Sequence, residues 1–137
     1  MFELVEHIPG REELLTLYEA NGWRAYTVDP DGLHRGVTNS TYVVAAREEG
    51  QLIGLARVVS DDHSIMYLQD ILVLPSHQRR GIGRALLERC LERFAHCRGK
   101  VLLTDDEDRQ IRFYESLGYV QATDVPHLTA FVWGQDG

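Results

Sequence analysis

The sequence predicts a mixed α/β sheet with helices on both faces, and two segments carry that prediction. The first is a pair of β-rich runs, Thr41–Arg47 and Gln51–Val59, whose connection through Glu48-Glu49-Gly50 is typical of a β-hairpin. The second is Gly81–His96, where apolar residues recur along one side at the spacing of an amphipathic helix. The chain has 137 residues, the length of one ordinary domain, so we expect residues 1–137 to form a single domain.

The N-terminal third is expected to form a strand and two helices. Phe2–His7 is a short strand that Pro9-Gly10 ends. Arg11–Asn21 carries an apolar stripe at helical spacing, and Asn21-Gly22 is a good helix stop. Asp29-Pro30-Asp31-Gly32 opens either a turn or a short helix that runs through Val37.

The second half alternates strands and helices. Ile65–Leu74 is mostly apolar without clear alternation, which indicates a strand buried on both faces at the centre of the sheet. After the Gly81–His96 helix we expect a short strand, a helix that Gly118 ends, and two closing strands: Val101–Thr104, Asp106–Leu117, Tyr119–Ala122 and Leu128–Trp133.

Composition narrows the class of protein. Apolar residues make up 44% and charged residues 26%, as in a soluble globular chain, and no apolar run reaches the roughly 18 residues of a membrane span. The acidic start and the absence of a leader pattern favour a cytoplasmic protein without membrane attachment. The net charge of −7 argues against a nucleic-acid partner. Cys90 and Cys97 have no partners at metal-ligand spacing, so we expect buried thiols and no metal.

The loop between the central strand and the long helix is the segment that indicates chemistry. Gln78-Arg79-Arg80-Gly81-Ile82-Gly83 precedes the helix directly, and Arg84 follows. Glycine lets backbone N–H groups approach a ligand, and the N-terminus of a helix attracts anions, so a pyrophosphate is the expected ligand. A Walker loop needs Lys-Ser or Lys-Thr where Arg84-Ala85 stands, and a dinucleotide fingerprint needs a third glycine where Leu86 stands.

The remaining pattern, Gln-x-x-Gly-x-Gly, resembles the signature of the GNAT superfamily of acyl-CoA N-acyltransferases. About 30 residues later, Arg112–Tyr119 resembles the family's Phe-Tyr-x-x-Leu-Gly-Phe element, with Tyr119 in place of the final phenylalanine. The resemblance implies a mostly antiparallel mixed sheet that splays between its fourth and fifth strands, with acetyl-CoA in the gap. Those strands would be Ile65–Leu74 and Val101–Thr104.

The resemblance also assigns roles to individual residues. The backbone of Ile71, Leu72 and Val73 would bind the pantetheine arm, and the N–H group of Leu72 or Val73 would face the thioester oxygen. The pyrophosphate would be held by the N–H groups of Gln78, Arg79, Arg80, Gly81, Ile82, Gly83 and Arg84. Tyr114 matches the tyrosine that protonates the leaving thiolate as general acid. Glu107 stands where many relatives have a pantetheine-contacting asparagine, and it is either a solvated helix-capping residue or part of an acidic rim at the acceptor site.

The general base is not assigned by the sequence. Family members often carry Glu or His on the central strand, but the matching positions here are Tyr67 and Gln69, and an amide cannot act as a base. Asp70 is expected on the opposite face of the sheet by strand alternation. We therefore expect a water chain positioned by Gln69 and Tyr67, with His63 and His127 as alternative bases.

The resulting expectation is an acetyl-CoA-dependent N-acetyltransferase that acetylates a primary amine of a small molecule by direct attack in a ternary complex. Trp23 and Tyr26 either form a wall of the acceptor pocket or hold their loop on the core. Alternatives are a protein N-terminal or lysine acetyltransferase and a non-catalytic acyl-CoA sensor. Family resemblance also raises a homodimer formed through Leu128–Trp133.

Overall fold

The computed structural model describes residues 1–134, which fall into two compact parts: Met1–Leu103, and the segment from Thr104 onward. The first part contains the whole β-sheet and four of the helices. The second contains α5 (Asp108–Glu115) and a short 3₁₀ turn, η2 (Ala122–Asp124). That residues 1–137 form one domain stays a prediction.

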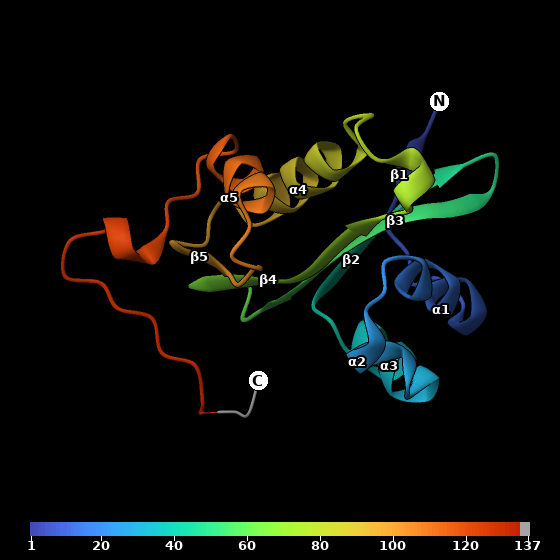
Figure 1. The fold of residues 1–137 in the computed structure, drawn as a ribbon, viewed down its shortest axis with the longest axis horizontal. Helices are drawn as coiled ribbons and strands as arrows, with labels where there is room; N and C mark the ends of the chain where they lie inside the picture. Colours follow the sequence, from blue (N-terminus) through green and yellow to red (C-terminus); the bar gives the residue numbers. More distant parts are fainter. Residues whose placement is uncertain (135–137) are drawn as a thin grey trace. The chain divides into compact units, whose positions relative to one another are not determined.

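The sheet of the first part has five strands in sequential order, β1-β2-β3-β4-β5 (Figure 1). Their bounds are Glu3–Val5, Tyr42–Glu48, Gln51–Ser60, Ile65–Val73 and Gly99–Leu102. The first three pairings are antiparallel, and β4 pairs with β5 in parallel. The mixed, mostly antiparallel sheet is therefore confirmed.

Helices cover both faces of this sheet, as predicted. Three helices lie on one face and α4 lies on the other (Figure 1). Their bounds are α1 (Arg11–Ala20), α2 (Arg24–Thr27), α3 (Pro30–Thr38) and α4 (Ile82–Arg93). The sequence did not predict α2, because four residues are too few to show a helical period. α3 begins where Asp29 accepts a hydrogen bond from the Gly32 N–H, with Pro30 in the first turn.

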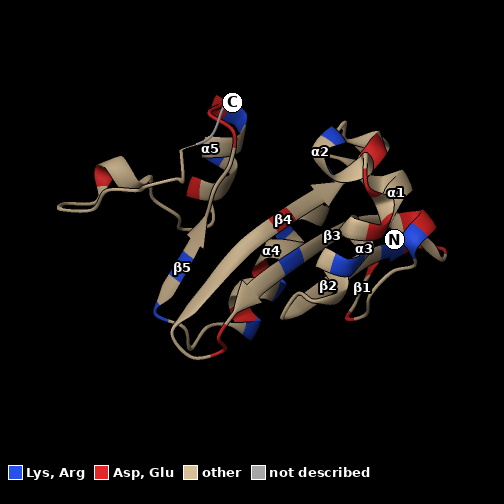
Figure 2. Cartoon of the chain, turned by 90° about the horizontal axis from the view of Figure 1, so that it is seen from below, with Lys and Arg blue, Asp and Glu red and all other residues tan. Residues whose placement is uncertain are grey.

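The core lies on both sides of β2, β3 and β4. Residues 42–46 and 52–58 are buried without interruption, because each face of these strands is covered by a helix. α1 contributes Leu14, Leu17 and Tyr18, and α4 contributes Ile82, Leu86, Leu87 and Cys90. Charged side chains are few in the strands and mixed in sign on the helices (Figure 2). Within residues 1–134, no helix combines the length and the apolar character that a membrane crossing requires.

The helix predicted over Gly81–His96 ends earlier, at Arg93. Cys97 therefore lies beyond the helix, although both cysteines are free and buried, as expected. Burial raises the pKa of the Cys90 thiol to about 12.

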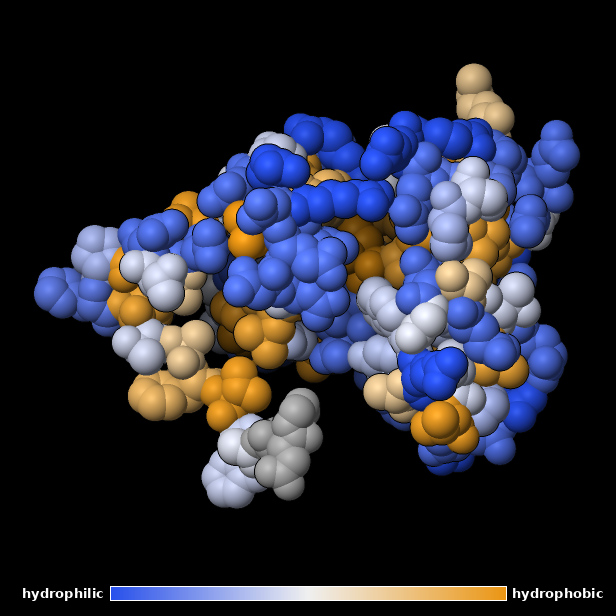
Figure 3. All heavy atoms as spheres, viewed as in Figure 1, coloured by the Kyte–Doolittle hydropathy of each residue, from blue (hydrophilic) through white to orange (hydrophobic). Residues whose placement is uncertain are grey.

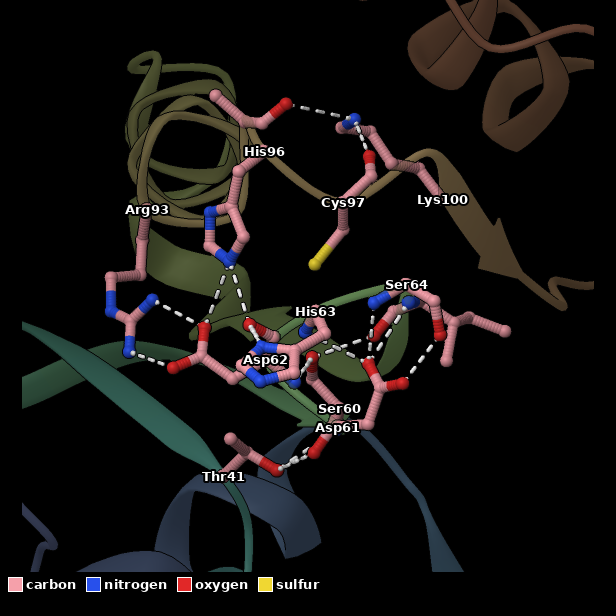
Figure 4. Close-up of polar contacts among 12 residues, drawn as sticks. Thr41, Ser60, Asp61, Asp62, His63, Ser64, Arg93, His96, Cys97 and Lys100 are labelled. Atoms are coloured by element: carbon pink, nitrogen blue, oxygen red, sulfur yellow. Dashed lines mark hydrogen bonds and ion pairs between the residues drawn. The ribbon is translucent and has the colours of Figure 1, made fainter.

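The turn between β3 and β4 is held by two aspartates (Figure 4). One carboxylate oxygen of Asp61 accepts hydrogen bonds from three successive backbone N–H groups, those of residues 63, 64 and 65. Asp62 lies 3.0 Å from a guanidinium nitrogen of Arg93 and 3.0 Å from His96 Nε2. The turn is thereby fastened to the end of α4.

The two closing strands predicted over Tyr119–Ala122 and Leu128–Trp133 are wrong: the described part of the chain has no strand after Leu102. Local chemistry explains why. The Tyr119 N–H bonds the Tyr114 carbonyl as a cap of α5, and η2 curls the backbone over residues 122–124. Pro126 has no N–H, and His127 has a left-handed φ of 65°.

Without a strand, the apolar side chains of this segment remain exposed. Phe131 is 92% and Trp133 87% exposed. In Figure 3, which has the same view as Figure 1, apolar residues are visible on the surface of the C-terminal segment.

Candidate functional site

The loop that follows β4 turns sharply into α4. Pro75–His77 form a single 3₁₀ turn, and Gln78 Nε2 donates to the Val73 carbonyl at 3.2 Å, which fixes the loop against the end of the strand. Arg79 and Gly81 then take left-handed φ values of 65° and 80°. Gly81 is the N-cap of α4, and nothing lies within 4 Å of where its Cβ would be. What glycine supplies here is the left-handed conformation itself rather than room for a neighbour.

Two of the three arginines around this loop, Arg80 and Arg84, already have acidic partners within the chain. Arg80 Nη2 lies 2.5 Å from Glu48 Oε2, and Arg84 lies 3.4 Å from Glu88 one helical turn later. Glu48 also lies 3.4 Å from His77 Nε2. The hydrogen bond from Arg80 lowers the pKa of Glu48 to about 2. No sequence pattern indicates this role for Glu48. The hairpin pattern assigns it to a turn, where acidic residues are ordinarily solvated, whereas in the structure it is the last residue of β2.

Among residues 1–134, the second half of β4 pairs with no strand on its β5 side. β5 pairs with β4 only over Ile65–Leu68, and it ends at Leu102, opposite Leu68. On the other side, Ile71–Val73 pair with Gly54–Ala56 of β3. The splay predicted between the fourth and fifth strands is therefore confirmed, and Ile71, Leu72 and Val73 lie in the strand segment beyond it.

A β-bulge at Gln69 corrects the expected placement of Asp70. Arg57 pairs with Asp70 and the next residue, Val58, pairs with Leu68, so Gln69 is the extra residue on β4. Simple alternation would send Gln69 and Asp70 to opposite faces. In the structure both contact one hydroxyl: Tyr26 Oη donates to Asp70 Oδ1 at 2.8 Å and accepts from Gln69 Nε2 at 3.0 Å. The expectation that Asp70 lies away from Gln69 is thus wrong.

Asp70 is the centre of a buried polar cluster. It is 5% exposed, and Arg57, which is 7% exposed, donates to it from Nε at 2.7 Å. Tyr18 and Tyr26 donate their hydroxyls to the same carboxylate, at 3.0 and 2.8 Å. Burial, followed by the charge of Asp70, raises the pKa of both tyrosines, so both hydroxyls keep their protons.

The aromatic residues around α2 pack on one another and on α1. Tyr18 meets the ring of Trp23 edge-on at 5.6 Å and that of Tyr26 at 5.2 Å. This packing supports the interpretation in which Trp23 and Tyr26 hold their loop on the core. Tyr26 also lines a cavity of about 310 Å³ between α2, α3 and β3, so one residue can serve both roles. The other lining residues are Ala25, Asp29, Gly32, Leu33, Gly36 and Arg57.

In the first part of the chain, two further predicted site residues lie on β4 and in the turn before it. Tyr67 is half-buried on β4, in register with Val101 of β5. His63 is exposed in the β3–β4 turn. In the part from Thr104 onward, Tyr114 is 8% exposed on α5. His127 is exposed and lies outside any helix or strand.

Glu107 is the N-cap of α5, is exposed, and makes no side-chain capping bond. The two interpretations of Glu107, solvated helix-start residue or acidic rim, therefore both stay predictions. Across residues 1–134 there is no group of three or more His, Cys, Asp or Glu side chains arranged to hold a metal ion.

Comparison with known proteins gives consistent results. The L-amino acid N-acyltransferase MnaT of Escherichia coli is 28% identical over 123 residues, which are 82% of this chain and 72% of that protein. Histone acetyltransferase TAP1 of Glycine max is 34% identical over 73 residues, which are 53% of this chain and 31% of that protein. The chain thus matches only about a third of the first curated relatives' length.

A solved structure matches the whole chain. The GNAT-family acetyltransferase SP0256 of Streptococcus pneumoniae TIGR4 has a TM-score of 0.85 and 28% identity, and 100% of both chains is covered. The sequence pattern of the acetyltransferase (GNAT) family matches residues 8–119. The chain therefore belongs to the GNAT family of acetyltransferases.

Proposed function

We propose that this protein is an acetyl-CoA-dependent N-acetyltransferase that acetylates a primary amine of a small molecule by direct attack in a ternary complex. The observation that carries the proposal is the β4 segment beyond Leu68, which has no partner in β5 and runs into the left-handed loop at Gly81. GNAT acetyltransferases use acetyl-CoA, and an unpaired strand edge followed by a helix N-terminus fits an extended amide-bearing arm followed by a pyrophosphate.

The proposed contacts with acetyl-CoA follow from the family resemblance. The backbone of Ile71–Val73 binds the pantetheine arm, and the backbone N–H groups of residues 78–84 bind the pyrophosphate. Glu107 is proposed as a further cofactor contact. Such N–H groups bind without competing for the charge that Arg80 shares with Glu48.

In the proposed reaction, a carbon–nitrogen bond forms as a carbon–sulfur bond breaks. The amine nitrogen forms a bond to the thioester carbon, the carbon–sulfur bond breaks, and the thiolate takes the proton of Tyr114, which regains a proton from solvent. The amine's surplus proton passes to water positioned by Gln69 and Tyr67. The phenol of Tyr114 has an O–H group that can donate its proton to a leaving thiolate.

A small acceptor is supported by the cavity and by a relative. The cavity of about 310 Å³ beside Tyr26 is at the low end of volumes that hold a small molecule. The relative MnaT is named an L-amino acid N-acyltransferase, so its acceptors are small molecules. TAP1 is named a histone acetyltransferase, so a protein lysine is the acceptor that the experiment must distinguish.

The test is release of free CoA from acetyl-CoA in the presence of an amine panel that includes amino acids, aminoglycosides and a histone-tail peptide. We expect turnover with a small amine, and a fall of 10²-fold or more in Tyr114→Phe. Turnover with the peptide alone would favour a protein acetyltransferase. Binding of CoA by calorimetry without turnover on any amine would favour a non-catalytic sensor, and no binding at all would overturn the cofactor proposal.

We also propose a cytoplasmic protein that forms a homodimer through Leu128–Trp133. The exposed apolar side chains of Phe131 and Trp133 support an association there. Sedimentation should show a dimer that Phe131→Ser converts to a monomer. A monomer at all concentrations in the unaltered protein would refute the dimer.

A further inference from the structure

The hydrogen bonds around Tyr26 form a chain with only one possible direction. A carboxylate only accepts hydrogen bonds, and Asp70 is held next to Arg57, so the Tyr26 hydroxyl donates its one proton to Asp70. Tyr26 Oη can then only accept from Gln69. The amide of Gln69 must therefore turn its Nε2 toward Tyr26, at 3.0 Å.

This direction fixes the outer end of the chain. Once Nε2 faces Tyr26, the amide oxygen of Gln69 is the end that faces away from the buried pair. Gln69 is half-exposed, whereas Asp70 and Arg57 are buried, so the oxygen lies on the accessible side of the cluster. A free glutamine on a surface would present either end, but here the buried charge selects the acceptor end.

Gln69 also lies where the proposed thioester would be. It is the first β4 residue beyond the β5 pairing and the extra residue of the bulge, which removes it from the ladder with β3. Bulges re-aim side chains beside active sites. Tyr26 belongs to the wall of the cavity of about 310 Å³, so the chain connects that cavity to the open part of β4.

We propose that the amide oxygen of Gln69 accepts a hydrogen bond from the attacking amine of the acceptor, with Tyr26 and Asp70 as the positioning residues that hold the amide in that orientation. Gln69 takes no proton in this role. It aligns the amine and leaves the proton to water. The inference rests on the proposed acetyltransferase function, which supplies the amine.

The experiment is a double-mutant cycle on Gln69→Met and Tyr26→Phe, read as kcat/KM for the acceptor and KM for acetyl-CoA. Loss of one neutral hydrogen bond changes an affinity by about three- to tenfold, so each single variant should lower kcat/KM for the acceptor by that factor. KM for acetyl-CoA should not move. Because Tyr26 acts through Gln69, adding Tyr26→Phe to Gln69→Met should cost less than twofold more.

Two comparison variants separate positioning from general stability. Tyr18→Phe removes a hydroxyl that donates to the same carboxylate but does not contact Gln69, and it should change kcat/KM for the acceptor by less than twofold. Gln51→Met makes the same chemical change on an exposed residue at the start of β3 and should have no effect. Thermal melts of every variant check the fold.

The outcomes are distinct. Additive losses in the cycle, or an unchanged kcat/KM in Gln69→Met, would overturn the positioning role while leaving the acetyltransferase function intact. An unaltered protein that acetylates no amine would instead refute the proposed function, and the role of Gln69 with it. If Tyr18→Phe lowered kcat/KM for the acceptor as much as Tyr26→Phe does, the effect would come from Asp70 and its packing. That result would also contradict the proposal.

Discussion

The carboxylate of Glu48 lies 2.5 Å from a guanidinium nitrogen of Arg80, in the loop proposed to hold the pyrophosphate. The pair joins the end of β2 to the residue before the N-cap of α4. A bound pyrophosphate would therefore lie near an arginine whose positive charge is already neutralised by the carboxylate of Glu48.

Glu48→Gln should strengthen CoA binding. The substitution removes one negative charge beside the proposed pyrophosphate site and releases Arg80, and exposed ion pairs of this kind change affinities by about two- to fivefold. Calorimetric titration with CoA at low and high salt measures the effect, which should shrink at high salt. Glu49→Gln, at the next residue, in the turn that follows β2, is the matched control. Weaker CoA binding in Glu48→Gln would mean that Glu48 orders the loop rather than competes with the ligand.

Gly81→Ala should destabilise the protein and weaken CoA binding together. At φ 80° a Cβ costs about 1–2 kcal/mol, and no neighbour within 4 Å adds a clash. Gly22 has a similar φ of 72° and equally open surroundings, but it lies after α1. Gly22→Ala should therefore lose similar stability in urea unfolding while CoA affinity stays unchanged. Equal affinity losses in both variants would remove the loop from the cofactor site.

Prediction from sequence succeeded where the pattern is local and periodic. The apolar stripe of α1 and the strand–loop–helix pattern from Ile65 to the end of α4 predict these elements and the position of the Gly81 loop. Prediction failed where the outcome depends on contacts distant in sequence. The bulge that joins Gln69 to Asp70 is a register event between two strands, and alternation along one strand cannot reveal it. The pairing of Glu48 with Arg80 spans 32 residues and has no sequence signature.

Removing one partner of the buried ion pair between Arg57 and Asp70 should lower the stability of the fold more than replacing both partners with apolar residues. Asp70→Ala leaves a buried guanidinium unpaired, which costs about 3–5 kcal/mol. The double variant Arg57→Met with Asp70→Leu removes both charges and should recover most of that loss, although the Tyr18 and Tyr26 hydroxyls then lack their acceptor. Urea unfolding of the two variants measures the difference. A double variant no more stable than Asp70→Ala would show that the carboxylate matters to the tyrosines more than to Arg57.

Asp61 should contribute to the acid sensitivity of the fold. Its hydrogen bonds from the Ser64 hydroxyl and from backbone N–H groups lower the pKa of Asp61 below its ordinary value of 3.8 (Figure 4). A carboxylate with a lowered folded-state pKa stabilises the fold above the unfolded pKa, and that stability is lost as the pH falls. The decrease in urea midpoint between pH 6 and pH 2.5 should therefore be smaller in Asp61→Asn than in the unaltered protein. Glu19→Gln, an exposed acid near the end of α1, serves as the control and should leave the decrease unchanged.

Cys90 should carry no acetyl group during turnover. A nucleophilic cysteine must form a thiolate, and burial raises the pKa of the Cys90 thiol to about 12, far above neutral pH. Direct attack by the amine therefore predicts that mass spectrometry after incubation with acetyl-CoA alone finds no acetylated protein. Cys90→Ala should lose about 1 kcal/mol from the small cavity it leaves in the core, yet keep turnover within about twofold. Cys97→Ala removes the other buried thiol, and we expect it to behave in the same way. An acetyl group found on Cys90, or turnover abolished in Cys90→Ala alone, would contradict direct attack and would indicate a covalent acetyl-cysteine intermediate.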